Sequence, residues 1–91
     1  MSAASTVPNL DAMDHEDLMS FWAMHQRGRV AWQVFPNGGK GTRNATGDLA
    51  CYASNKATAI ACRLRGDIAT ALSYERICDS IYEGLPAWAR W

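Results

Sequence analysis

Apolar residues recur at helical spacing in three stretches of this chain, separated by glycine-containing breaks. Side chains three and four positions apart share one face of an α-helix, so each stretch predicts a helix with one apolar side. The stretches cover about residues 14–27, 44–65 and 67–84. The pattern therefore predicts an all-α fold: a small bundle of three main helices, followed by a short tryptophan-bearing turn at the C-terminal end.

Local signals mark the ends of these helices. Asp14 is a good N-cap for the first helix, because its carboxylate can accept a hydrogen bond from a free backbone N–H of the first turn. Gly66 and Asp67 separate the second and third helices and cap them, and Pro86 follows the end of the third. Residues 29–35 alternate between apolar and polar positions and stay open between a strand and a helical turn.

The composition is that of one small globular domain. Of the 91 residues, 48% are hydrophobic and the formal net charge is zero, which is unlike a disordered chain or a strongly basic DNA-binding domain. We expect residues 1–10 to form a flexible tail and residues 11–91 a single helical domain. The chain shows neither a signal peptide nor a stretch able to span a membrane, so we expect a cytoplasmic protein with its cysteines reduced in the core.

Small side chains line one side of the predicted second helix. They form two adjacent rows with four-residue spacing, made of Ala50, Ser54, Thr58 and Cys62 and of Ala53, Ala57 and Ala61. Such a strip allows another helix to approach closely. Two partners stay open: the third helix, across the Gly66 turn, or a second copy in a homodimer. A bulky residue at Ala57 distinguishes them, since loss of folding indicates the first and a folded monomer the second.

An acidic ridge runs along the predicted third helix. Its residues, Glu75, Asp79 and Glu83, are one helical turn apart, and like charges at this spacing repel each other. The ridge is either a solvated face that pairs with Lys56 or Arg63 across the hairpin, or a docking surface for a basic partner.

Two tryptophans, Trp88 and Trp91, lie three residues apart near the C-terminal end. Each can bury a large apolar area, so we expect neither to remain in water. They either dock against the bundle of the same chain or anchor a partner, as interface tryptophans do. Together with the acidic ridge, they are the predicted partner-binding residues.

A glycine-rich loop before the second helix is a candidate anion site. Residues 38–43 read Gly-Gly-Lys-Gly-Thr-Arg and combine basic side chains with backbone N–H groups near a helix N-terminus. Because Gly41 separates Lys40 from Thr42, the loop is not a Walker A motif. The loop is either solvated and flexible or it binds phosphate or a nucleic-acid backbone, through Lys40, Arg43, Arg27 and Arg29.

No pattern in the sequence points to catalysis. His15 and His25 lie on different faces of one predicted helix and cannot bind one metal ion together. No second histidine follows His15 and Glu16 at the spacing found in zinc hydrolases. We therefore expect no catalytic residue, no metal ligand and no cofactor, in a protein that is not an enzyme.

Two resemblances concern the second half of the chain. Residues 65–72, Arg-Gly-Asp-Ile-Ala-Thr-Ala-Leu, resemble the turn and second helix of a tetratricopeptide repeat, although Glu75 stands where that family has an aromatic residue. One such hairpin is present where solenoids need about three, so the resemblance implies only a packed helical hairpin. The second half also resembles small helical proteins of phages and mobile elements, on segments 52–56, 63–68, 74–79 and 88–91. That resemblance implies an accessory role.

The sequence thus predicts a small non-enzymatic interaction protein, an accessory factor of a phage or mobile element that binds a protein partner and can form a homodimer. The alternative is a module that binds nucleic acid or phosphate through the basic loop. A salt titration on a polyanion separates the two, because binding to nucleic acid weakens steeply with salt.

Overall fold

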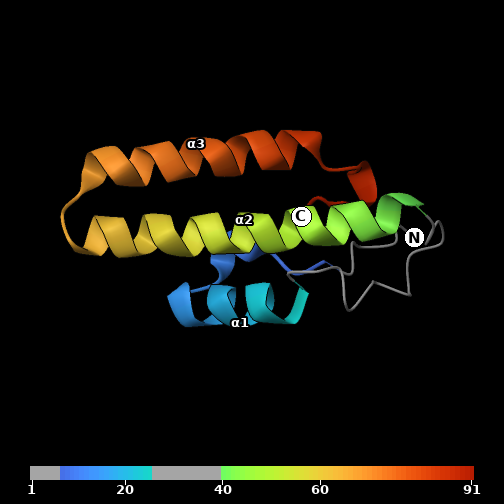
Figure 1. The fold of residues 1–91 in the computed structure, drawn as a ribbon, viewed down its shortest axis with the longest axis horizontal. Coiled ribbons are helices and arrows are strands. Elements are labelled where there is room, and N and C mark those ends of the chain that lie inside the picture. The colour runs from blue at the N-terminus through green and yellow to red at the C-terminus, as the bar shows by residue number, and fades with distance from the viewer. Residues whose placement is uncertain (1–6, 26–39) are drawn as a thin grey trace.

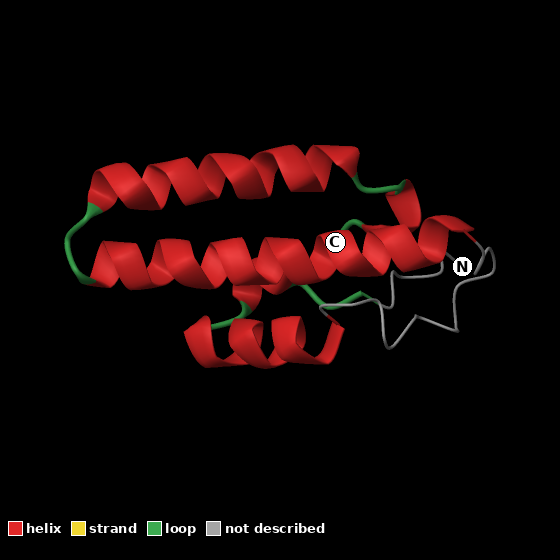
Figure 2. Ribbon diagram, viewed as in Figure 1, coloured by secondary structure: helices red, strands yellow, loops and turns green. Residues whose placement is uncertain are grey.

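The computed structural model describes residues 7–25 and 40–91, and the side chains of the second range from residue 45 onward. In these residues every regular element is helical, which confirms the predicted all-α bundle of three main helices (Figure 2). The elements in chain order are η1 (Leu10–Ala12), α1 (His15–His25), α2 (Lys40–Leu64), α3 (Ile68–Gly84) and η2 (Ala87–Ala89), where η marks a 3-10 helix.

The three α-helices are arranged around α2. Figure 1 shows α1 and α3 on opposite sides of α2, and α2 packs against both of them. α2 and α3 run antiparallel as a hairpin, and the chain after α3 returns to α2, where the Trp91 ring meets the Tyr52 ring edge to face. The central helix is therefore covered on two sides.

α2 begins earlier than the sequence predicts. The expected start near residue 44 is corrected to Lys40, so Lys40 and Arg43 belong to the helix and not to an irregular loop. Gly41 and Gly47 lower the intrinsic helix propensity of this stretch. Tertiary burial offsets that cost, because Ala45, Thr46 and Leu49 are at most 2% exposed.

The turn between α2 and α3 forms as predicted. Gly66 has a φ of 80°, in the left-handed region that favours glycine. The N–H of Gly66 donates to the Arg63 carbonyl at 3.0 Å, and that of Asp67 donates to the Cys62 carbonyl at 2.9 Å, which is the pattern of a Schellman motif. The Asp67 carboxylate accepts from the N–H of Thr70 at 3.2 Å. One short turn thus ends α2 and caps α3.

The N-terminal segment belongs to the domain from residue 7 onward. Val7 and Leu10 are 4% and 0% exposed and form part of the core with Leu18 and Phe21 of α1. The prediction of a flexible tail over residues 1–10 is therefore wrong for residues 7–10, because the Val7 and Leu10 side chains are buried in the core. Residues 1–6 lie outside the described residues.

The small-residue strip of α2 is buried at its two edges. Ala53 and Cys62 are 0% and 1% exposed, although nine residues at 3.6 per turn place them on opposite sides of the helix. Between these edges Ala50 and Ala57 are also buried, at 1% and 0% exposed. The other residues of the strip, Ser54, Thr58 and Ala61, are half-buried. The strip was expected to meet α3 or a second copy. Because α1 also packs on α2, one helix faces two neighbours within the same chain.

Candidate functional site

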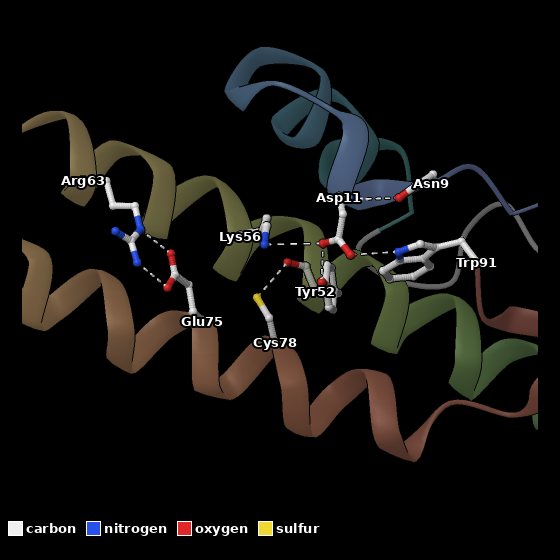
Figure 3. A network of polar contacts seen from close by, with 8 residues as sticks. All are labelled: Asn9, Asp11, Tyr52, Lys56, Arg63, Glu75, Cys78 and Trp91. Carbon is white, nitrogen blue, oxygen red and sulfur yellow. Dashed lines mark hydrogen bonds and ion pairs between the residues drawn. The ribbon is translucent and has the colours of Figure 1, made fainter.

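Asp11 is the centre of a polar cluster that joins three parts of the chain (Figure 3). The side chain of Asn9 accepts from the Asp11 N–H at 3.0 Å and caps η1. The Asp11 carboxylate accepts from the Tyr52 hydroxyl at 2.5 Å and from the Trp91 indole N–H at 3.0 Å. The Lys56 ammonium nitrogen lies 3.4 Å from the same carboxylate. One side chain thus connects η1, α2 and the C-terminal residue.

Three aromatic rings pack beside this carboxylate. The Trp91 ring meets Tyr52 and Tyr82 edge to face, with centroid separations of 4.8 and 4.7 Å. The Tyr82 hydroxyl donates to the Trp91 carbonyl at 2.5 Å. The Arg90 guanidinium lies over the Tyr82 ring, 5.7 Å from its centroid, and donates to the Glu83 carbonyl at 2.7 Å. These contacts hold the C-terminal segment against α2 and α3.

The surroundings shift the pKa of two groups in the cluster. Partial burial by itself raises the pKa of Asp11. The hydrogen bonds from Tyr52 and Trp91 and the charge of Lys56 together outweigh this effect, so the pKa lies below its ordinary value of 3.8. The pKa of Tyr52 is raised, most strongly by burial. The hydrogen bond to Asp11 and the negative charge of that carboxylate raise it further. At neutral pH the pair is therefore a carboxylate and a neutral phenol.

A cleft of about 550 Å³ opens beside the cluster. Its walls consist of three carboxylic and three aromatic side chains, which are Asp11, Asp79, Glu83, Tyr52, Tyr82 and Trp91. Carboxylates attract cations by charge, and aromatic rings attract them by the negative potential of the ring face. The cleft therefore has the chemistry of a cation-binding site.

The predicted acidic ridge divides into a paired and an unpaired part. Glu75 accepts two hydrogen bonds from the Arg63 guanidinium, at 2.6 and 2.8 Å, and this pairing lowers the pKa of Glu75. Arg63 is one of the two bases that the sequence offers as partners. Asp79 and Glu83 are exposed and form no ion pair within the described part of the chain. The unpaired charge thus lies at the end of α3 that borders the cleft.

The structure brings three of the five predicted partner-binding residues together. Asp79, Glu83 and Trp91 line the cleft, whereas Glu75 and Trp88 do not. Both tryptophans are half-buried and pack against the core, which confirms that they dock on their own bundle. Their role in binding a partner stays a prediction.

The predicted anion site falls largely outside the described residues. Arg27 and Arg29 lie there entirely, and the side chains of Lys40 and Arg43 are likewise not described. Anion binding by these four residues stays a prediction.

The cysteines and histidines of the described residues do not form a metal-binding cluster. All three thiols are free, and Cys51 is exposed, contrary to the expectation that every cysteine lies in the core. The buried Cys78 thiol donates to the Tyr52 carbonyl at 3.7 Å, and burial raises its pKa to about 11, so it is protonated and weakly nucleophilic at neutral pH. The His25 ring packs against the Phe21 ring at a tilt of 50°, with ring centroids 4.5 Å apart. Across residues 7–25 and 40–91, no group of acidic, histidine or cysteine side chains is placed to hold a metal ion.

Sequence reasoning did not identify Asp11, Tyr52 and Tyr82 as members of the site. Asp11 is 41 residues from Tyr52 and 80 residues from Trp91 along the chain, so no local spacing relates them. One signal was present: Tyr52 lies on the predicted second helix on the side away from the small-residue strip, and a tyrosine that is buried needs a hydrogen-bond partner for its hydroxyl. That signal predicts a partner without identifying it.

No family model, curated protein sequence or solved structure matches this chain. None of the helices in the described residues combines the length and the apolar character needed to cross a membrane.

Proposed function

We propose that this protein is a non-enzymatic binding protein that docks a basic segment of a protein partner on the C-terminal half of α3 and in the cleft beside it. The observation that supports this most directly is the cleft, which is lined by three carboxylates and three aromatic rings. Asp79 and Glu83 leave their negative charge unpaired at its edge, within the described residues. A basic segment complements that charge.

The exposed face of α3 extends this surface. Ile68 and Leu72 are 45% and 41% exposed, and their helical spacing places them on the same face as Asp79 and Glu83. The face is thus apolar near the start of α3 and acidic near its end. Such a surface suits a partner with both apolar and basic side chains, because apolar contact supplies affinity and charge supplies orientation.

The same proposal includes self-association and a cytoplasmic, accessory role in a phage or mobile element. Ser54, Thr58 and Ala61 are half-buried small residues and leave part of α2 accessible to a second copy. Light scattering on the purified protein tests this part: a mass of two chains supports it and a mass of one chain contradicts it.

Calorimetric titration with a short oligo-arginine peptide tests the docking surface. We expect the peptide to bind at low salt and to weaken as salt screens the charges. The neutral double variant Asp79→Asn/Glu83→Gln is expected to bind about tenfold more weakly. The control Glu16→Gln/Asp17→Asn makes the same charge change at exposed positions of α1 and is expected to keep the affinity.

Equal affinities of the two double variants, or no binding of the peptide at low salt, would contradict the proposal. Heparin serves as the polyanion in a parallel titration. Salt-dependent binding to heparin in place of the peptide would favour the alternative function, binding of nucleic acid or phosphate through Lys40, Arg43, Arg27 and Arg29.

A further inference from the structure

The lining of the cleft favours a flat organic cation as its ligand. Its three carboxylates come from η1 and from two turns of α3, and they are not placed to bind one metal ion. The aromatic rings of Tyr52, Tyr82 and Trp91 share the walls with them. A guanidinium group is planar, stacks on aromatic rings and donates several hydrogen bonds to carboxylates at the same time.

The protein shows this kind of contact within its own chain. The Arg90 guanidinium lies over the Tyr82 ring and donates to the carbonyl of Glu83. Arg90 itself does not line the cleft. The end of α3 thus already holds one guanidinium through a ring and an oxygen. The Asp79 and Glu83 carboxylates, which line the cleft, form no ion pair within the described residues.

We propose that the cleft is a subsite for a single arginine side chain. Asp79 and Glu83 pair with the guanidinium, and the aromatic wall of Tyr82 and Trp91, whose rings meet edge to face, packs against one of its faces. Asp11 also lines the cleft; Tyr52 and Trp91 hold its carboxylate in place, and Lys56 pairs with its charge. This inference rests on the proposed function and refines it, since it names the side chain of the partner that enters the cleft.

Three blocked tripeptides test the inference by NMR: Gly-Arg-Gly, Gly-Lys-Gly and Gly-citrulline-Gly. Citrulline has the shape of arginine without its charge. The reporter is the indole N–H of Trp91, which is hydrogen-bonded to Asp11 and is assigned from the spectrum of Trp91→Phe. We expect arginine to shift this signal and to bind about fivefold more tightly than lysine. The citrulline peptide is expected to bind at least about tenfold more weakly than arginine.

A pair of variants at one position isolates the ring. Tyr82→Leu removes the aromatic face and is expected to weaken arginine binding about fivefold, whereas Tyr82→Phe keeps the ring and is expected to keep the affinity. The backbone amide spectrum of each variant shows whether the fold is retained. Equal losses in both variants would overturn the assignment, because the hydroxyl contact with Trp91 would then be the cause.

The outcomes separate this inference from the proposed function. If oligo-arginine binds but arginine and lysine tripeptides are equivalent and the Trp91 signal does not move, the docking surface stands and the arginine subsite is overturned. If the arginine tripeptide and free arginine amide bind in the cleft while the longer basic peptide does not, the subsite stands and its ligand is a free small cation, so the proposed function fails.

Discussion

At the scale of single residues, the Asp11 carboxylate does the most to organise the site. Its side chain is 48% exposed, yet it accepts hydrogen bonds from Tyr52 and Trp91 and lies next to Lys56. Hydrogen bonds to a charged group are stronger than neutral ones, but solvent reduces them when the group is exposed. Asp11 therefore stabilises the fold moderately and fixes the position of the cleft wall.

Replacing Asp11 by Asn is expected to lower the free energy of unfolding by about 1 kcal/mol at neutral pH, because the charge is lost and one donor loses its acceptor. The pKa of Asp11 is lower in the fold than its ordinary 3.8, so its stabilisation is present above pH 3.8 and is lost as pH falls through the folded pKa. Urea titrations of both proteins from pH 7 to pH 3 measure this.

The difference between wild type and Asp11→Asn is thus expected to shrink on acidification. Tyr52→Phe is the matched control, since it keeps the ring contact with Trp91 and removes one hydrogen bond to Asp11. A difference that stays constant down to pH 3 would show that Asp11 does not titrate with a lowered pKa.

At the scale of elements, the packing of α2 explains why this helix carries so many small residues. It lies between α1 and α3 (Figure 1), and Ala53 and Ala57 are fully buried in the core with Leu18 and Phe21. A larger side chain there has no free volume to enter, because protein interiors are close-packed. Ala61, on the same strip, is only half-buried.

Ala57→Leu is therefore expected to lower the free energy of unfolding by about 1–3 kcal/mol through overpacking. Ala61→Leu makes the same chemical change at a half-buried position and is expected to have a clearly smaller effect. Thermal unfolding followed by circular dichroism measures both. A stable Ala57→Leu protein whose oligomeric mass falls would instead assign this row to a contact between two copies.

At the scale of the whole molecule, the two ends of the described chain are held together. The Trp91 indole N–H donates to Asp11, and the Trp91 ring contacts Tyr52 of α2 and Tyr82 of α3. Val7 and Leu10 bury their side chains in the same core. The cleft wall thus depends on both ends of the domain.

Trp91→Ala is expected to loosen η1 selectively. The amides of Ala12 and Met13 donate to the carbonyls of Asn9 and Leu10, and we expect their hydrogen exchange to become about tenfold faster. The amide of Ala71 in α3 is the internal reference and is expected to remain unchanged. Uniform acceleration across the protein would mean that Trp91 supports the global fold and not the N-terminal segment in particular.

The sequence by itself determined the helices and the turn that joins the last two. Apolar spacing predicted α1, α2 and α3, and Gly66 with Asp67 marked their junction, because capping and left-handed backbone are properties of a few neighbouring residues. The sequence also named Lys56 or Arg63 as the partner of the acidic ridge across the hairpin, and Arg63 pairs with Glu75.

Only the tertiary structure decided what the helix faces meet. It extended α2 back to Lys40, brought residue 7 into the core and placed α1 beside α2. It also assembled the cleft from Asp11, Tyr52, Tyr82 and Trp91, whose neighbours in space are far apart in the chain. The physical reason is that apolar spacing shows which face of a helix is buried, but many partners can cover that face equally well.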